Sequence, residues 1–528
     1  MQYAEPAALH RSSPFKSSSH CKPSPNGLLV AALISSTVIV RSTKTLQTVH
    51  TVKLSPELTG PISNFIWSPS STAILISAGD QIQVSSVSGS SFNAIIQHPA
   101  APVAGKLPLI RFGATDMELL ACAPLGLKFM VFDLSTSKAV EIGNPKFFHS
   151  NSASRGFSIR PGTGHLVVLT RTGGKDMLSI HHPSTRQITR SWHPDAIDAQ
   201  GVQWSPDGQW IIAWDAPVQG RRLFVYTSDG QHYRTLSTSQ LMPDPNEDPE
   251  SDMELGIRNC HFSSNAELCV VRDHSRGAIV LQVGIWRSMM RLWHPAAATP
   301  SETLQVWQEQ VHSGGDGSPV HTFVKADKAV SPPTLADHTT PLGDARSSCS
   351  LTKFDASSTL LAITLDDCPC TIWIWDLGAA ELRAAIIFHS VVHFSWHPTS
   401  REVLLISSLE DGKQSASYIW DPLSRGPKAL NAEHFLPTSQ TLQKAQVAWL
   451  HNESATPELL ASDTQHYTLL SLADAEYEHS PWEAAAGGSV LDGLPSGQDV
   501  DASINSATPI VITEDISKLD DTFSFKYT

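Results

Sequence analysis

An internal repeat constrains this chain more than any other feature. Three clear copies, residues 65–69 (Phe-Ile-Trp-Ser-Pro), 202–208 (Val-Gln-Trp-Ser-Pro-Asp-Gly) and 394–398 (Phe-Ser-Trp-His-Pro), place an aromatic residue directly before a polar turn. Weaker copies are centred on Cys21, Phe112, Ile159, Phe262, Phe354 and Trp449. Five of the eight spacings between successive copies fall between 42 and 47 residues. That spacing is close to the period of about 40–45 residues that is typical of a four-stranded repeat unit.

Each unit contains short apolar runs that end at Gly, Pro, Asp or Ser, a pattern typical of strands joined by hairpins. Residues 210–214 and 223–226 form two such runs, and residues 360–364 and 371–375 repeat them. No long segment combines a period of 3.6 residues with helix caps. A single four-stranded sheet cannot bury both faces, whereas sheets stacked around an axis bury each face on a neighbour.

The sequence therefore predicts an all-β propeller of about nine blades in one ring. Two incomplete rings are the alternative, because nine units exceed the usual range of about four to eight blades. We expect a flexible N-terminus at residues 1–20, blades 1–6 at 21–293, an irregular insert with short strands at 294–350, blades 7–9 at 351–473 and a mostly disordered tail at 474–528. Within the tail, residues 510–512 (Ile-Val-Ile) have the composition of an added strand.

The net charge of the chain limits the classes of partner that we expect it to bind. The chain has 37 Lys and Arg against 51 Asp and Glu, a net charge of −14. An acidic surface repels phosphate backbones and anionic lipids, so we expect neither a nucleic-acid nor a membrane partner. No apolar stretch approaches the roughly 20 residues that span a bilayer. Seven scattered cysteines in so long a chain indicate a reducing compartment, and we expect a soluble intracellular protein.

Sequence motifs for catalysis or metal binding are mostly absent from the chain. Cys368 and Cys370 are close together but lack a second Cys or His pair at metal-binding spacing. The chain contains no Gly-x-Ser-x-Gly elbow and no His-Glu-x-x-His motif. We therefore predict no catalytic, cofactor or metal site. An enzyme in the propeller channel remains a rival, and it would require carboxylates or histidines that converge on the innermost strands.

Aromatic residues supply the candidate functional positions. Trp286 and Trp293, followed by His294, could form an exposed anchor for a partner, since interfaces favour aromatics. Packing between blades is the favoured interpretation for both tryptophans, because large aromatic side chains are usually well buried.

The order of motifs resembles the WD-repeat family of centriolar satellites and spindle poles, the Wdr-eight family, over about residues 26–472. Four passages carry the resemblance: residues 156–171 with 177–181, 201–208 with 213–215, 255–257 before Phe262, and Trp286 followed by 294–297 (His-Pro-Ala-Ala). The chain departs from the family in an acidic, Pro-rich insert at 237–254 and in its long tail.

The resemblance implies roles for particular residues. Trp375-Asp376 and Trp420-Asp421 are similar to WD dipeptides, in which the Trp packs between blades and the Asp accepts hydrogen bonds from a nearby turn. The full set of expected blade signatures is Trp67, Trp204, Trp375, Asp376, Trp396, Trp420 and Asp421.

The resemblance also implies a function. Members of such a family are non-catalytic scaffolds that anchor microtubule minus ends at a spindle pole body or centrosome, with a coiled-coil anchoring protein and a kinesin-14 motor as partners. A cytoplasmic, cytoskeletal location follows from it. A generic propeller adaptor, such as a translation-factor-like protein, is the main rival.

Overall fold

The computed structural model describes most of the chain. It covers residues 9–88, 92–97, 109–122, 128–146, 156–237, 256–273, 276–313, 319–334, 351–399, 402–410, 413–437, 445–451, 456–474, 482 and 510–512. Within these ranges no helix is long and apolar enough to cross a membrane.

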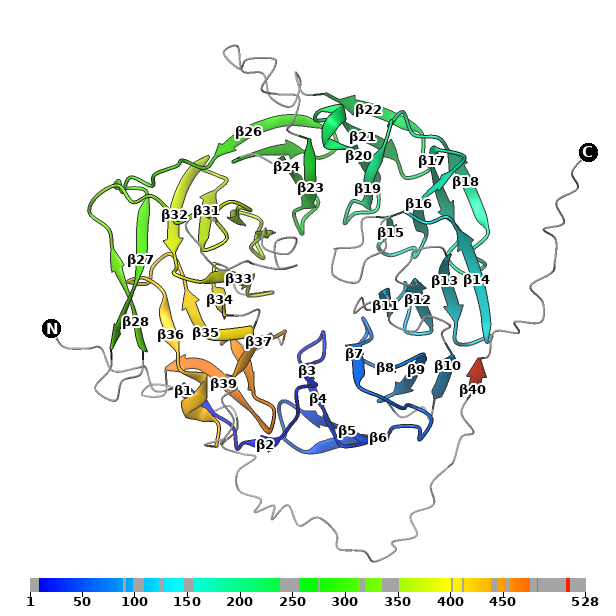
Figure 1. Cartoon of the computed structure of the whole chain (residues 1–528), viewed down its shortest axis with the longest axis horizontal. Helices are drawn as coiled ribbons and strands as arrows, with labels where there is room; N and C mark the ends of the chain where they lie inside the picture. Colours follow the sequence, from blue (N-terminus) through cyan, green and yellow to red (C-terminus); the bar gives the residue numbers. More distant parts are fainter. Residues whose placement is uncertain are drawn as a thin grey trace, which may run out of the picture.

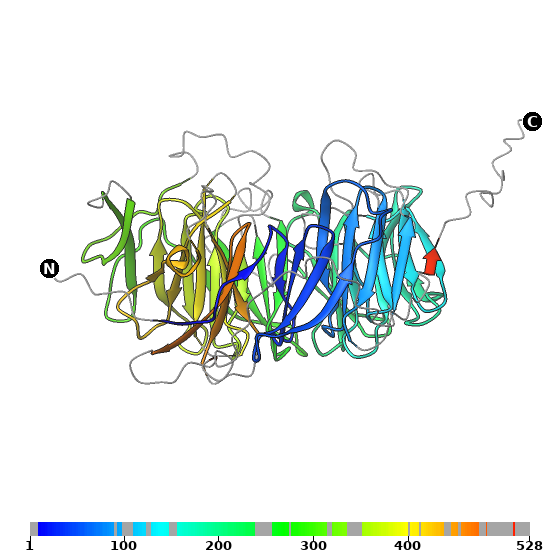
Figure 2. The ribbon, with the colours of Figure 1, turned by 90° about the horizontal axis from the view of Figure 1, so that it is seen from below.

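The described strands form nine sheets around one axis, so the fold is a single nine-bladed β-propeller (Figure 1). This confirms the predicted all-β ring, and the alternative of two incomplete rings is wrong. Seen from the side, the ring is a disc whose strands run across its thickness (Figure 2). Each weak or strong copy of the repeat lies in the innermost strand of one blade, where its aromatic or apolar residue is at or beside the strand end.

Blades 1 to 3 are regular four-stranded antiparallel sheets in chain order, apart from one added strand on blade 2. Their strands are β3 (Cys21–Pro23), β4 (Leu29–Ile34), β5 (Thr37–Ser42) and β6 (Thr48–Lys53); β7 (Ile62–Trp67), β8 (Ala73–Ala78), β9 (Gln81–Ser86) and β10 (Asn93–Gln97); and β11 (Leu109–Phe112), β12 (Glu118–Cys122), β13 (Lys128–Asp133) and β14 (Lys138–Gly143).

Blades 4 to 6 repeat the pattern. Their strands are β15 (Phe157–Ile159), β16 (Leu166–Thr172), β17 (Lys175–His181) and β18 (Ile188–Trp192); β19 (Ala199–Trp204), β20 (Trp210–Asp215), β21 (Leu223–Thr227) and β22 (His232–Leu236), with the 3-10 helix η1 (Pro217–Gln219); and β23 (Ile257–Phe262), β24 (Leu268–Asp273), β25 (Gly277–Gln282) and β26 (Arg287–Trp293).

Blades 7 to 9 complete the ring. Their strands are β29 (Thr352–Phe354), β30 (Leu360–Thr364), β31 (Thr371–Asp376) and β32 (Glu381–Ile387); β33 (Val391–Trp396), β34 (Leu404–Glu410), β35 (Lys413–Trp420) and β36 (Lys428–Leu430), followed by the 3-10 helix η5 (Ala432–Phe435); and β37 (Gln446–Leu450), β38 (Glu458–Ser462) and β39 (His466–Asp474).

The N-terminal segment closes the ring. Strands β1 (Leu9–Arg11) and β2 (Phe15–Lys16) both pair antiparallel with β39, so that blade 9 is built from the two ends of the repeat region. The expectation of a flexible N-terminus over residues 1–20 is therefore corrected for residues 9–20. An unpaired β39 edge would expose backbone groups that need partners, and β1 supplies them.

The insert after blade 6 extends blade 7. Strands β27 (Gln305–Ser313) and β28 (Pro319–Lys325) form a hairpin, and β27 pairs parallel with the outer strand β32. Blade 7 is consequently a six-stranded sheet. In the tail, β40 (Ile510–Ile512) pairs parallel with β10 of blade 2. Most of the tail that was expected to be disordered lies outside the described residues.

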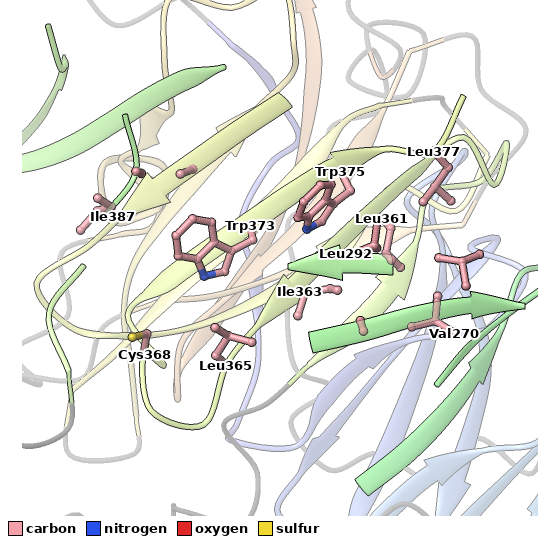
Figure 3. Close-up of a cluster of buried hydrophobic side chains, with 14 of the residues drawn as sticks. Val270, Leu292, Leu361, Ile363, Leu365, Cys368, Trp373, Trp375, Leu377 and Ile387 are labelled. Carbon is pink, nitrogen blue, oxygen red and sulfur yellow. The ribbon is translucent and has the colours of Figure 1, made fainter. Parts of the chain in front are cut away.

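The core consists of apolar layers between neighbouring blades. Strand β31 shows how one strand serves two layers, since successive side chains point to opposite faces. Trp373 and Trp375 face blade 6, where they pack with Val270 and Leu292 (Figure 3). Ile372 and Ile374 belong to the cluster shared with blade 8.

Candidate interaction surface

The aromatic residues that end the innermost strands link adjacent blades. The indole Nε1 of Trp67 donates a hydrogen bond of 3.0 Å to the backbone carbonyl of Lys22 in blade 1. Trp396 makes the equivalent bond, 2.9 Å long, to the carbonyl of Lys353 in blade 7. Both tryptophans are buried. These repeat residues therefore act in the architecture of the ring and are not available to a partner.

Trp204 ends the innermost strand of blade 5 and is also buried, but its contacts with blade 4 differ. Its backbone N–H donates to Ser158 Oγ at 3.0 Å, and the guanidinium of Arg160 lies 5.3 Å from the centre of its indole ring. Arg160 in turn donates to the carbonyl of Gly208, in the turn that follows Trp204. A cation over the indole face replaces the indole hydrogen bond used by Trp67.

The two WD-like dipeptides have polar contacts of the kind that the resemblance implies. Asp376 Oδ1 accepts hydrogen bonds from the backbone N–H groups of Gly378 at 3.0 Å and Ala379 at 3.1 Å. Asp421 Oδ1 accepts one from Leu423 at 2.9 Å. Trp420 is buried. Each aspartate thus orders the turn directly after its strand.

Trp286 and His294 are interior residues, which corrects the hypothesis that they belong to an exposed anchor. Both have an exposed fraction of 0%. Trp286 packs edge-on against Trp210, with ring centres 5.9 Å apart. His294 Nδ1 lies 2.5 Å from the carbonyl of Arg276, and its Nε2 accepts a hydrogen bond of 3.1 Å from Trp375 Nε1. Burial lowers the pKa of His294 to about 3, so this ring is neutral at physiological pH.

Trp293 is the one member of the proposed anchor that faces solvent. It is 50% exposed at the end of β26, the outermost strand of blade 6 at the rim of the ring (Figure 1). Met289 on the same strand is 53% exposed, and Ile285 in the turn before it is 52% exposed. Side chains alternate along β26, so Leu292, between Arg291 and Trp293, points the other way and is buried in the layer between blades 6 and 7. We call Ile285, Arg287, Met289, Arg291 and Trp293 the β26 patch.

The β26 patch is basic as well as apolar. The guanidinium of Arg291 lies 5.4 Å from the Trp293 ring centre, and Arg287 is exposed. β26 itself contains no acidic residue. Trp, Met and Arg are the residue types most enriched in protein interfaces. On a chain with a net charge of −14, this combination suits a partner with both apolar and acidic side chains.

Three observations bear on the alternatives of a metal site and of an enzyme site in the channel. Burial raises the pKa of the Cys368 thiol to about 11, so the thiol is protonated at neutral pH. Among the described residues, no three His, Cys, Asp or Glu side chains are grouped as metal ligands. The nine innermost strands as described contain two histidines, His261 and His393, and no Asp or Glu. An enzyme with its site in the channel would require carboxylates or histidines on these strands. The strands as described carry no carboxylate.

The ring of blades is a β-propeller, and its Trp-Asp dipeptides resemble those of WD40 repeats. The chain is 23% identical over 485 residues to an uncharacterised WD repeat-containing protein of Schizosaccharomyces pombe, covering 88% of this chain and 91% of the relative. It is also 23% identical over 425 residues to the WD repeat-containing protein WRAP73 of Mus musculus, covering 76% of this chain and 84% of that protein. No protein-family model matches the chain.

Two solved structures are also similar in shape. One is a eukaryotic initiation factor, with a TM-score of 0.49, 10% sequence identity, and coverage of 81% of this chain and 91% of that chain. The other is the C-terminal WD40 domain of Sif2, with a TM-score of 0.42, 7% identity, and coverage of 89% and 99%.

Proposed function

We propose that this propeller is a non-catalytic scaffold that anchors microtubule minus ends at a spindle pole body or centrosome. The observation that carries the scaffold role is the β26 patch, where Trp293 and Met289 are half exposed at the rim of the ring. A propeller is held together by nine interlocking blades and presents such a surface without rearrangement.

A coiled-coil protein is the partner proposed for this patch. The outer positions of coiled coils often carry Glu beside the apolar seam. Such a helix offers carboxylates to Arg287 and Arg291 and aliphatic side chains to Met289 and Trp293. A kinesin-14 motor is proposed to join the same assembly. The spindle-pole assignment rests on the motif resemblance. The similarity to WRAP73 over 76% of this chain supports the WD-repeat scaffold alone.

Affinity purification of the tagged full-length chain from dividing cells tests the proposal. We expect a coiled-coil spindle-pole protein and a kinesin-14 motor in the eluate, and the tagged chain at the spindle poles in fluorescence microscopy. Recovery of ribosomal subunits in their place, with a diffuse signal, would favour the translation-factor-like rival.

Substitutions test the β26 patch separately. The double variant Met289→Glu with Trp293→Glu should lose the coiled-coil partner. Its matched control is Val49→Glu with Ile188→Glu, since Val49 and Ile188 are each 56% exposed on the outer strands of other blades. Equal retention of the partner by both variants would show that the patch is not the docking site.

A further inference from the structure

One position recurs around the inside of the ring. In blades 2 to 9 this position is the residue directly before the aromatic or apolar residue of the repeat, in the innermost strand. In blade 1 it is the residue before Pro23. The nine residues, which we call the channel ring, are Lys22, Ile66, Arg111, Ser158, Gln203, His261, Lys353, Ser395 and Ala448. None of them is buried, whereas the preceding residue is buried in eight of the nine blades. Side chains alternate along a strand, so these nine residues point to the opposite sheet face from the residue before them. They lie on the innermost strands, and the exposed part of each side chain borders the central channel.

Hydrogen bonds confirm that these positions are equivalent. The indole of Trp67 bonds the carbonyl of Lys22, and that of Trp396 bonds the carbonyl of Lys353. In blade 9, Trp449 Nε1 donates a bond of 3.1 Å to the carbonyl of Ser395. Each bond connects the end of one innermost strand to the channel-ring residue of the blade before it, so the ring lies at one level of the channel.

The charge of the channel ring is opposite to that of the whole protein. It contains three cations, Lys22, Arg111 and Lys353, and no carboxylate among its nine positions. Burial lowers the pKa of the fourth basic residue, His261, to about 4, so its ring is neutral at physiological pH. The net charge of the chain is −14. Lys22 and Arg111 are open to solvent, yet enough protein surrounds them to lower the pKa of both through desolvation. An anion in the channel would offset this unfavourable desolvation.

Nearby carboxylates already have partners. Asp355 is buried, and its Oδ1 accepts backbone hydrogen bonds of 2.8 Å from both Thr359 and Leu360. Asp366 forms an ion pair of 2.9 Å with Arg258. Both carboxylates are therefore held by groups outside the channel ring.

Part of the channel ring borders a pocket of about 490 Å³ formed by residues of blades 5 to 9. His261 and Lys353 line it, together with the indole of Trp396 and the ring of Pro398. Lys353 Nζ donates a hydrogen bond of 3.3 Å to the backbone carbonyl of Phe394, which leaves further N–H groups of the ammonium for a ligand. The Lys353 ammonium beside apolar rings suits a chain in which carboxylates alternate with apolar side chains.

We propose that the channel ring and this pocket bind an acidic peptide segment of a partner protein. The three cations lie in blades 1, 3 and 7, on different sides of the channel (Figure 1). One small anion cannot meet all of them, whereas an extended peptide that crosses the channel can. The inference deepens the proposed scaffold role by adding a second docking site with a stated ligand chemistry.

Fluorescence anisotropy with a short labelled peptide rich in glutamate tests the proposal on the full-length protein. We expect binding that weakens as salt screens the charges. The triple variant Lys22→Gln, Arg111→Gln and Lys353→Gln should lower the affinity roughly tenfold, from three exposed charge contacts. The matched control is Lys44→Gln, Lys138→Gln and Lys175→Gln, three exposed lysines outside the innermost strands, which should bind like the unaltered protein.

Three outcomes would overturn the inference. They are equal weakening in both triple variants, no binding of the peptide by the unaltered protein, and tight binding of inorganic tripolyphosphate with none of the peptide. Circular dichroism and thermal melting confirm that the variants are folded before binding is compared. The assay uses purified protein, so its failure is distinguishable from a failure to reach the spindle pole.

Discussion

Two blade interfaces in this ring are held together in different ways. Between blades 6 and 7, fifteen buried apolar residues form one layer that includes Trp373 and Trp375. Where blade 9 meets blade 1, the corresponding layer among the described residues has seven members. The first interface joins segments that are consecutive repeats, whereas the second must bring together the two ends of the repeat region.

Contacts from outside the repeats strengthen the closure. Ser12, beside β1, donates its backbone N–H to the carbonyl of Leu469 at 2.9 Å. Trp482, from the tail, is buried, and its Nε1 donates to the carbonyl of Thr43 in blade 1 at 2.9 Å. The comparison teaches that added segments can substitute for apolar area where a circular fold has to close.

Deleting residues 1–18 should have the largest effect. It removes β1 and β2, leaves the edge of β39 without a partner and opens blade 9. We expect the largest fall in melting temperature of the changes considered, measured by circular dichroism. A synthetic peptide spanning residues 9–18 should restore part of the loss. An unchanged melting temperature would mean that the ring closes without its N-terminal strand.

Trp375→Ala should destabilise the interface between blades 6 and 7 by about 3–5 kcal/mol, because it leaves a cavity between packed sheets. It also removes the hydrogen bond to His294. Chemical denaturation measures the change in the free energy of unfolding. Trp293→Ala is the matched control, and at a half-exposed position it should change stability by no more than about 0.5 kcal/mol. Similar losses in the two variants would contradict the packing argument.

Trp482→Ala should cost less, about 1–3 kcal/mol. Its indole closes the layer between blades 9 and 1, but Trp482 lies outside the blade strands, so its loss leaves the strand pairing of both blades intact. Hydrogen exchange should show faster exchange in β4 and β38 and little change in blade 6. A loss as large as that of Trp375→Ala would show that the tail is integral to closure.

Acid should weaken the interface between blades 6 and 7 through His294. Burial holds its pKa at about 3, against about 6.5 for a free histidine. Between these values the unfolded chain binds more protons, so stability falls as pH falls through this window, by up to about 1.4 kcal/mol per pH unit for this group. His294→Gln should reduce the pH dependence of unfolding, and His232→Gln, at an exposed position, should not. Parallel pH profiles for all three proteins would refute the assignment.

The sequence predicted the ring well because the information for it is local. The spacing of Trp67, Trp204 and Trp396 sets the blade period, and all three lie at the ends of innermost strands. Continuous apolar runs such as Ile372 to Trp375 in β31 specify burial on both faces. The first strand of blade 1 begins at Cys21 and the last strand of blade 6 ends at Trp293.

Features that depend on distant partners could not be predicted. Pairing of β1 with β39 links residues at opposite ends of the repeat region. Arg186 in blade 4 binds both carboxylate oxygens of Glu118 in blade 3, at 2.5 and 2.6 Å, and no local pattern marks this buried pair. The candidate anchor failed in part for a similar reason. Trp286 and Trp293 look alike in sequence, and only the fold places one inside and the other at the rim.

The pairing of β1 with β39 also has a consequence for synthesis. Ser12 and its hydroxyl partner Thr468 are 456 residues apart. At about 5–20 residues per second, the N-terminal strand leaves the ribosome roughly 25–90 seconds before the strand that receives it. Throughout that interval β1 has no partner strand, and the growing arc of blades leaves the blade 1 face that packs on blade 9 uncovered. A nascent protein of this design depends on a chaperone, or on rapid completion, to avoid joining its neighbours on the same polysome.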